Sequence, residues 1–262
     1  MLGKRKKIHF IGIGGIGMSG IAELLWNLGH SISGSDLMES DRTKYLQKMG
    51  INVKIGHKKK HIIGTDLVVY SSAVKLDNCE IKASEEMNVP FIKRSEMLGE
   101  LLKVKPNSVA ISGTHGKTST TSMLGIILNE AKREPTLVVG GIVHEFQSNS
   151  ISGKGDTIVV EADEYDKTLL SLKPSMSVVT NIEYEHTDCY PDIDSLKDTF
   201  LSFINSVPFY GINLIYYDDV NIQSILHKIR RPYLKYGKSD ECDIRFVQFD
   251  HRSHAPFFTI AQ

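Results

Sequence analysis

The fold is decided by the stretch Ser112-Gly113-Thr114-His115-Gly116-Lys117-Thr118-Ser119-Thr120, which follows the apolar run Val109-Ala110-Ile111. Two glycines between a buried strand and a helix let the backbone bend so that several N–H groups point into one concavity, which favours an anion. The expected helix adds unpaired amides and the positive end of its dipole. Its apolar side is formed by Met123, Leu124, Ile127 and Leu128. The stretch therefore predicts a nucleotide phosphate site, with ATP as the leading candidate.

This loop departs from the standard P-loop. The standard pattern places a glycine at position 111, where this chain has Ile, so the predicted loop is shorter. By residue type, Lys117 is expected at the β and γ phosphates and the Thr118 hydroxyl on Mg²⁺. An ordinary strand-to-helix turn is the alternative interpretation.

A second glycine loop opens the chain. Residues 8–11 are apolar enough for a strand, and Gly12-Ile13-Gly14-Gly15-Ile16-Gly17 leads into a helical pattern. This spacing matches the dinucleotide fingerprint, in which glycines allow a diphosphate to approach the helix N-terminus. Asp36 lies 22 residues after Gly14, at the end of the strand predicted over 31–35, where a ribose-binding carboxylate is expected. A nicotinamide-dependent dehydrogenase would use this loop, but it would leave the other phosphate loop without a role.

Patterns typical of strands alternate with patterns typical of helices along both halves of the chain. This alternation predicts two domains of the α/β class with parallel sheets. Strands are predicted over 52–55, 67–70, 91–92, 157–160, 176–180 and 213–217, and helices over 193–206 and 220–229. The polar segment 102–108, which contains Pro106, interrupts the pattern. We place the boundary there, between residues 1–105 and 106–262.

Composition excludes several classes of partner. With 31 basic and 31 acidic residues, the chain has no net field that draws it to nucleic acid or to an anionic membrane. Cys79, Cys189 and Cys242 are odd in number and lack metal-site spacing, which suits a reducing compartment. No signal-peptide pattern or 18-residue apolar span is found. We expect a cytoplasmic protein.

Two polar clusters follow predicted strands of the second half. Glu161-Ala162-Asp163-Glu164 comes directly after Ile158-Val159-Val160, and Asn181 to Asp188 follow Ser177-Val178-Val179-Thr180. In open α/β sheets, ligands bind at this edge. Hard oxygen ligands with one imidazole, here from His186, suit Mg²⁺ that carries phosphate. The alternatives are an acidic helix N-terminus and a histidine without a ligand role.

Together these elements resemble the Mur ligases of peptidoglycan synthesis. The matching stretches are 9–20, 71–73, 94–98, 113–120, 161–164, 181–183 with His186, and 207–211. The resemblance implies a Rossmann-like domain in which the first glycine loop holds a UDP diphosphate rather than NAD, followed by a P-loop-type ATPase domain. It implies a UDP-sugar site formed by Gly12, Gly14, Gly15, Gly17, Asp36, Ser71, Ser72 and Arg94.

The resemblance is closest to the members that join L-alanine to the lactyl carboxylate of UDP-N-acetylmuramate. It implies that ATP converts this carboxylate to an acyl phosphate, which the amine of L-alanine then attacks. Such chemistry needs positioning and charge neutralisation. The implied ATP-binding residues are Gly113, Thr114, His115, Gly116, Lys117, Thr118, Ser119 and Asn181. The implied catalytic residues are Lys117, Glu161 and His186, and the implied Mg²⁺ ligands are Thr118, Glu161 and His186.

Two departures from the family pattern are visible. Glu185 stands before His186 where the family usually has Asp. Family members also continue into a His-Asn segment that holds adenine and a third domain, whereas this chain ends at Gln262, in an apparent strand of an incomplete central domain. We therefore expect UDP-sugar binding but little or no ligation by this polypeptide alone. A recycling ligase that attaches a murein peptide and a non-catalytic nucleotide-binding fragment are the alternatives, and the oligomeric state stays open.

Overall fold

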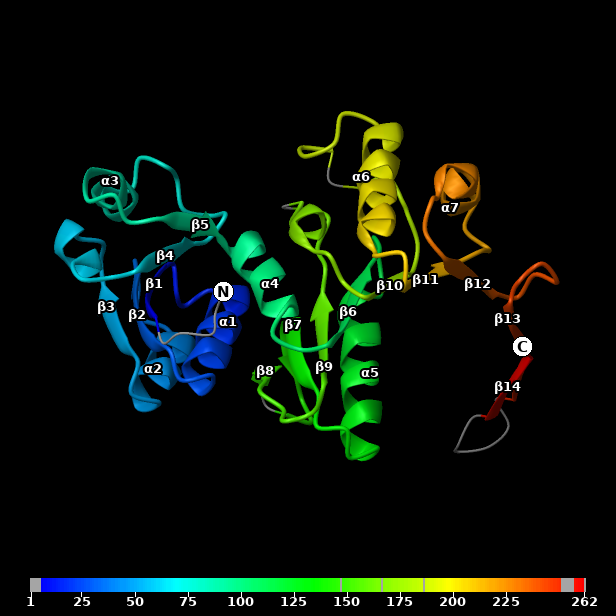
Figure 1. The fold of residues 1–262 in the computed structure, drawn as a ribbon, viewed down its shortest axis with the longest axis horizontal. Helices are drawn as coiled ribbons and strands as arrows, with labels where there is room; N and C mark the ends of the chain where they lie inside the picture. The colour runs from blue at the N-terminus through cyan, green and yellow to red at the C-terminus, as the bar shows by residue number, and fades with distance from the viewer. Residues whose placement is uncertain (1–5, 147, 166, 186, 251–256, 262) are drawn as a thin grey trace. The chain divides into compact units, whose positions relative to one another are not determined.

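The computed structural model describes residues 6–146, 148–165, 167–185, 187–250 and 257–261 (Figure 1). The chain forms two compact units. Unit 1 comprises Met1–Pro106 and Thr121–Val160, and unit 2 comprises Asn107–Thr120 and Glu161–Gln262. The chain passes from one unit to the other inside α5 (Lys117–Glu130) and near the end of β9 (Thr157–Glu161).

Unit 1 contains a five-stranded parallel sheet with the strand order β3-β2-β1-β4-β5. The strands are β1 (Lys7–Ile11), β2 (Ser31–Asp36), β3 (Asn52–Ile55), β4 (Leu67–Tyr70) and β5 (Phe91–Lys93). The intervening helices are α1 (Ile16–Asn27), α2 (Asp41–Lys48), the 3-10 helix η1 (Lys59–Ile62), α3 (Cys79–Glu86) and α4 (Arg94–Leu102). Strand order reverses between β1 and β4, and at such a point open α/β sheets bind their ligands beyond the carboxyl ends of the strands.

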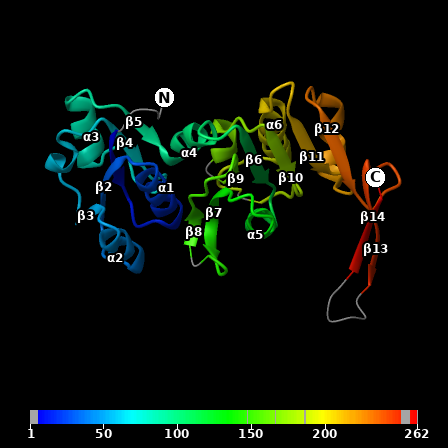
Figure 2. The ribbon, with the colours of Figure 1, turned by 60° about the horizontal axis from the view of Figure 1, so that its bottom comes forward.

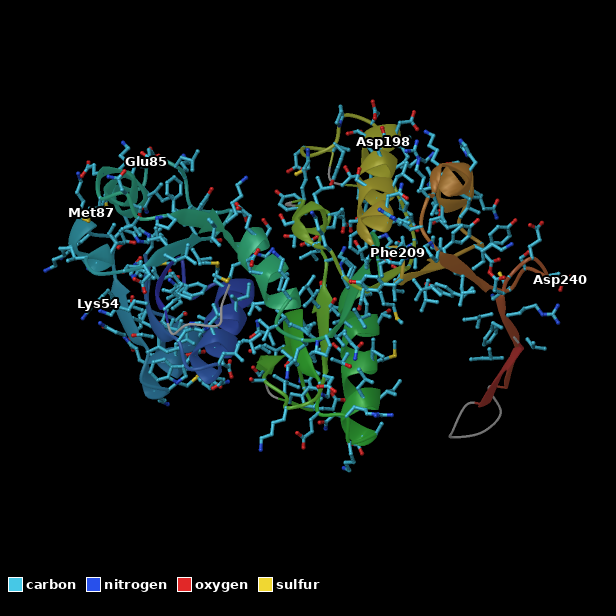
Figure 3. All side chains as sticks on the ribbon, viewed as in Figure 1. Lys54, Glu85, Met87, Asp198, Phe209 and Asp240 are labelled. Carbon is cyan, nitrogen blue, oxygen red and sulfur yellow. The ribbon has the colours of Figure 1, made fainter. Side chains whose placement is uncertain are left out.

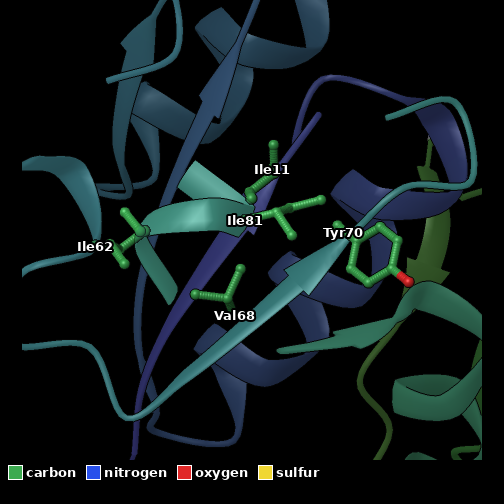
Figure 4. Packing of buried hydrophobic residues seen from close by; sticks show 6 residues of the cluster. Ile11, Ile62, Val68, Tyr70 and Ile81 are labelled. Carbon is green, nitrogen blue, oxygen red and sulfur yellow. The ribbon is translucent and has the colours of Figure 1, made fainter. Parts of the chain in front are cut away.

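The core of this sheet is formed by apolar side chains from β1, β4, η1 and α3. Ile11, Ile62, Val68, Tyr70 and Ile81 pack together in it (Figure 4). A parallel strand covered on both faces is apolar along its length, which is why β4 is a short continuous hydrophobic run. Strand β1 departs from this pattern at the buried His9.

Unit 1 also contains a hairpin that packs on α1. Strand β7 (Thr136–Val143) pairs antiparallel with β8 (Ser148–Ile151) and parallel with β9, and both hairpin strands contact α1. The buried Asn149 donates from Nδ2 to the Ile16 carbonyl at 2.6 Å, and Arg42 donates to its Oδ1 at 2.6 Å. The hairpin is therefore attached to the first turn of the helix that follows the first glycine loop.

The described residues of unit 2 form strands in the order β14-β13-β12-β11-β10-β6, parallel except for β14. They are β6 (Asn107–Ser112), β10 (Met176–Val179), β11 (Ile212–Tyr216), β12 (Tyr233–Gly237), β13 (Ile244–Asp250) and β14 (Phe257–Ala261). The helical elements are η2 (Thr168–Ser171), α6 (Ile193–Ser206), α7 (Val220–Ile225) and η3 (Leu226–Lys228), and α7 lies beside α6 (Figure 1). Figure 2 shows the neighbouring strands β6, β10, β11 and β12 from another side.

Helix α6 shows how the sequence places these elements. Asp192 caps its N-terminus by accepting from the Ser195 amide at 2.7 Å. One side of the helix is buried through Leu196, Phe200, Phe203 and Ile204, whereas Asp198 lies on the exposed side (Figure 3). This period of three to four residues is that of an amphipathic helix.

The predicted α/β class with parallel sheets is confirmed. The helix predicted over 220–229 is α-helical only to Ile225 and continues as the 3-10 helix η3. Among the described residues, no helix combines the length and apolar character needed to cross a bilayer.

Substitutions of two neighbouring isoleucines, at and just after the end of η1, test the packing of the core of unit 1. Ile62 is fully buried, whereas Ile63 is 68% exposed. We expect Ile62→Ala to lower the free energy of unfolding by about 2–5 kcal/mol, because a cavity adds to the lost burial. Ile63→Ala should change it by less than about 0.5 kcal/mol. Urea unfolding followed by the fluorescence of Trp26, the one tryptophan of the chain, measures both; equal effects would contradict this packing.

Candidate functional site

The loop after β6 has a backbone that only glycine fits at Gly113. Its φ is +139°, and a Cβ there would collide with Thr180 Oγ1 and lie 3.1 Å from the Asn181 amide nitrogen. Gly116 has a φ of +80°, directly before α5 begins. These two positions let the chain turn from β6 into α5 against the segment that follows β10.

The segment after β10 fixes the shape of this loop. The Asn181 side chain accepts from the His115 amide at 2.8 Å and donates to the His115 carbonyl at 3.1 Å. The Thr114 amide donates to the Asn181 carbonyl, and the Glu183 amide donates to Thr114 Oγ1 at 2.9 Å. Asn181, predicted as an ATP-binding residue, thus contacts the loop through both its side chain and its backbone.

The Lys117 ammonium group lies inside the loop. Its Nζ donates to the carbonyls of Gly113 and Thr114 at 2.8 and 3.1 Å, and to the two Glu164 carboxylate oxygens at 2.7 and 3.0 Å. The Lys117 side chain is 12% exposed and that of Glu164 is 1% exposed. Burial raises the pKa of the Glu164 carboxyl group, although the Lys117 charge acts in the opposite direction. Several hydrogen-bond acceptors therefore hold the ammonium group in one orientation, away from bulk solvent.

Glu164 and Tyr190 are two residues of this region that the sequence did not single out. The Tyr190 hydroxyl donates to the Glu164 carbonyl at 2.6 Å. Burial raises the pKa of Tyr190 to about 12, so its hydroxyl stays a donor at neutral pH. The acidic cluster was visible in the sequence, but nothing in it distinguished Glu164, which meets Lys117, from Glu161.

Thr118 and Glu161, two of the predicted Mg²⁺ ligands, lie together. Thr118 Oγ1 donates to Glu161 Oε1 at 3.0 Å. A hydroxyl and a carboxylate in contact are hard oxygen ligands that fit Mg²⁺. His186, the third predicted ligand, lies outside the described residues. Within the described part of the chain, no group of three or more His, Cys, Asp and Glu side chains forms a metal site by itself.

The first glycine loop of unit 1 is held by the end of β2. The amides of Gly12 and Ile13 both donate to the Ser35 carbonyl, at 2.8 and 3.1 Å. The amide of Gly14 donates to Asp36 Oδ2 at 2.7 Å. Asp36, predicted near the uridine or its diphosphate, is therefore hydrogen-bonded to the loop itself.

The other predicted UDP-sugar residues lie around this loop with one exception. A Cβ at Gly17 would come within 2.7 Å of Arg94 Nη1, so the guanidinium group lies against the start of α1. The Ser71 amide donates to the Ile11 carbonyl, and Ser71 Cβ is 3.3 Å from the position of a Cβ at Gly12. Gly15 donates from its amide to the Gly12 carbonyl. Ser72 is exposed beside Ser71, and no contact with the loop is described for it.

Family models match both parts of the chain. The model described as "Mur ligase family, catalytic domain" matches residues 7–106, and the one described as "Mur ligase middle domain" matches residues 111–260. The chain belongs to the Mur ligase family.

Relatives with known names cover the same region. The UDP-N-acetylmuramate–L-alanine ligase of Pelobacter propionicus is 48% identical over 260 residues, which are 99% of this chain and 56% of the relative. That of Myxococcus xanthus is 48% identical over 246 residues, covering 93% of this chain and 52% of the relative. The chain thus spans about half the length of these relatives.

Solved Mur ligase structures resemble the fold. The UDP-N-acetylmuramate:L-alanyl-gamma-D-glutamyl-meso-diaminopimelate ligase from Neisseria meningitides has a TM-score of 0.85 and 25% identity, covering 95% of this chain and 82% of that chain. The UDP-N-acetylmuramate-alanine ligase from Thermotoga maritima has a TM-score of 0.79 and 28% identity, covering 94% of this chain and 55% of that chain. Within the Mur ligase family, the likeness therefore extends over both units.

A glycine substitution tests the shape of the loop after β6. We expect Gly113→Ala to weaken ATP binding by on the order of tenfold or more, because its Cβ must displace Thr180 or the loop. Gly56→Ala is the control, since Gly56 has a φ of +81° with no heavy atom within 4 Å of the added Cβ. It should destabilise unit 1 without changing ATP affinity. Calorimetric titration of both variants with ATP measures their affinities. An unchanged ATP affinity in Gly113→Ala would contradict the loop geometry described above.

Proposed function

We propose that this chain supplies the UDP-sugar-binding and ATP-binding parts of a ligase that joins L-alanine to the lactyl carboxylate of UDP-N-acetylmuramate. The observation that carries the proposal is the position of Lys117, which is directed by two loop carbonyls and Glu164 beside the Thr118–Glu161 pair. The names of the relatives support L-alanine as the amino acid, rather than a murein peptide.

The proposed reaction has two steps. The lactyl carboxylate attacks the γ-phosphate of ATP, so that a new O–P bond forms and ADP leaves with the electron pair of the broken bond. The amine of L-alanine then attacks the acyl phosphate carbon, loses a proton, and expels inorganic phosphate. Neither step needs a covalent enzyme intermediate, so positioning and neutralisation of charge are what the protein must supply.

The residues of the loop after β6 fit this task. The first amides of α5 have no acceptor within the helix, and with the helix dipole they favour phosphate oxygens. Lys117 Nζ is near enough to the loop to exchange a carbonyl acceptor for a phosphate oxygen while it keeps its contact with Glu164. Glu164 in turn orients the ammonium group. Bound Mg²⁺ would neutralise phosphate charge, and Thr118, Glu161 and His186 are the residues proposed to hold it.

The first glycine loop fits a nucleotide diphosphate. The start of α1 offers its unpaired amides, and the Arg94 guanidinium group lies against Gly17, where a phosphate oxygen would meet both. Asp36 shapes the loop through the Gly14 amide. We assign UDP-sugar binding to residues 1–105 and ATP binding to residues 106–262, a division supported by the family matches over 7–106 and 111–260.

We place the reaction in the cytoplasm. Cys79, Cys189 and Cys242 are all free thiols in the structure, which suits a reducing compartment.

Substitution of the loop lysine tests the assignment of the two sites. We expect Lys117→Ala to abolish detectable ATP binding, because the phosphates lose their one buried cationic partner from the loop. Binding of UDP-N-acetylmuramate should stay within about twofold, since the first glycine loop belongs to another unit. Separate calorimetric titrations with ATP and with the UDP-sugar measure both affinities.

Lys228→Ala serves as the matched control, because Lys228 is an exposed lysine of the same unit. It should leave both affinities unchanged. Loss of UDP-sugar binding in Lys117→Ala, or ATP binding as tight as in the unaltered chain, would refute the assignment.

A further inference from the structure

A buried carboxylate lies beneath the first glycine loop. Glu80 is in the first turn of α3, where Asn78 caps the helix, and its side chain is fully buried. A carboxylate in the first turn is favoured by the helix dipole. Such a charge removed from water is stable only with several hydrogen-bond or cationic partners.

Glu80 has such partners from each element that surrounds it. Oε1 accepts from the Lys58 amide at 3.0 Å and lies 2.7 Å from His61 Nδ1. Oε2 accepts from Ser35 Oγ at 2.5 Å, with His57 Nδ1 at 3.4 Å and His9 Nε2 at 3.5 Å.

The hydrogen bonds to Glu80 keep it ionised. Burial acts to raise the pKa of Glu80, but the nearby His9 imidazole, together with hydrogen bonds from Ser35 and the Lys58 amide, outweighs it and lowers the pKa to about 2. The carboxylate is therefore an acceptor throughout the neutral range, and it connects β1, β2, the segment around η1, and α3.

Ser35 connects this cluster to the loop. Its hydroxyl is bound to Glu80, while its carbonyl accepts from the amides of Gly12 and Ile13. The next residue, Asp36, accepts from the Gly14 amide. Three consecutive amides of the glycine loop thus donate to Ser35 and Asp36 at the end of β2, which we call the Ser35–Asp36 corner. Glu80 is the buried hydrogen-bond partner of this corner, through the Ser35 hydroxyl.

We propose that Glu80 is a positioning residue for the UDP-sugar, acting through Ser35 to hold the glycine loop in its diphosphate-binding shape. The inference rests on the proposed function, since it takes the loop to bind the UDP diphosphate. Loop amides bind an anion well only when they are already oriented, and small displacements of such groups weaken binding strongly. Without the bond to Glu80, the Ser35 hydroxyl keeps its contact with His57 Nδ1 at 2.9 Å but loses its buried anionic acceptor, and the Ser35–Asp36 segment is held less firmly to the core.

The test compares two buried carboxylates of the same unit. Glu80→Gln should raise the Kd for UDP-N-acetylmuramate by about tenfold, as expected for loss of one hydrogen bond to a charged group, and leave the Kd for ATP unchanged. Glu23→Gln is the matched control, because Glu23 is also buried but contacts Tyr45, Ser148, Ser150 and, at 3.9 Å, the Arg42 guanidinium group rather than Ser35 or Asp36. It should leave the UDP-sugar affinity unchanged.

A double-mutant cycle separates positioning from general loss of stability. Ser35→Ala alone should raise the Kd for the UDP-sugar by a similar factor, and adding Glu80→Gln should raise it little further, because both act through one contact. Ser35→Ala also tests the proposal if Glu80→Gln does not fold, as judged by Trp26 fluorescence. Additive effects, an unchanged Kd in both single variants, or an equal effect of Glu23→Gln would overturn the inference. Failure of the unaltered chain to bind the UDP-sugar would instead overturn the proposed function, and the inference with it.

Discussion

The glycine loops of both units depend on one constraint: buried backbone amides in the turn after a parallel strand need hydrogen-bond acceptors that fix the conformation of the loop. In unit 1 the Ser35 carbonyl and the Asp36 carboxylate accept hydrogen bonds from the amides of the first glycine loop. In unit 2 the backbone carbonyl and the side-chain oxygen of Asn181 accept hydrogen bonds from the amides of Thr114 and His115 in the loop after β6. In each unit the acceptor stands at or just beyond the end of an adjacent strand, so parallel pairing itself brings acceptor and loop together.

The cationic side chains of Lys117 and Arg94 are also positioned by contacts with the backbone and side chains around the glycine loops. The Lys117 ammonium group is surrounded by loop carbonyls and the buried Glu164 carboxylate, which fix its direction. The Arg94 guanidinium group can approach α1 because position 17 is a glycine. Groups oriented in advance lose less freedom when a phosphate binds, so the binding free energy is not spent on ordering them.

Much of this could be predicted from sequence because the signals are local. Apolar runs followed by glycine loops predicted β1 and β6. The resemblance to the Mur ligases implied a shared Mg²⁺ for Thr118 and Glu161, and the Thr118 hydroxyl lies 3.0 Å from the Glu161 carboxylate. The contacts that were missed are buried polar pairs far apart in sequence, such as Ser35 with Glu80 and Lys117 with Glu164, separated by 45 and 47 residues. No local pattern distinguishes such a carboxylate from a solvated one. The β7–β8 hairpin was missed as well, because its packing depends on α1.

We expect the first glycine loop of this Mur ligase chain to bind a UDP-sugar rather than a nicotinamide dinucleotide. The decisive measurement is calorimetric titration of the unaltered chain with UDP-N-acetylmuramate and, separately, with NAD. We expect one UDP-sugar bound per chain and no heat from NAD. Binding of NAD without binding of the UDP-sugar would show that the loop is a dinucleotide site instead.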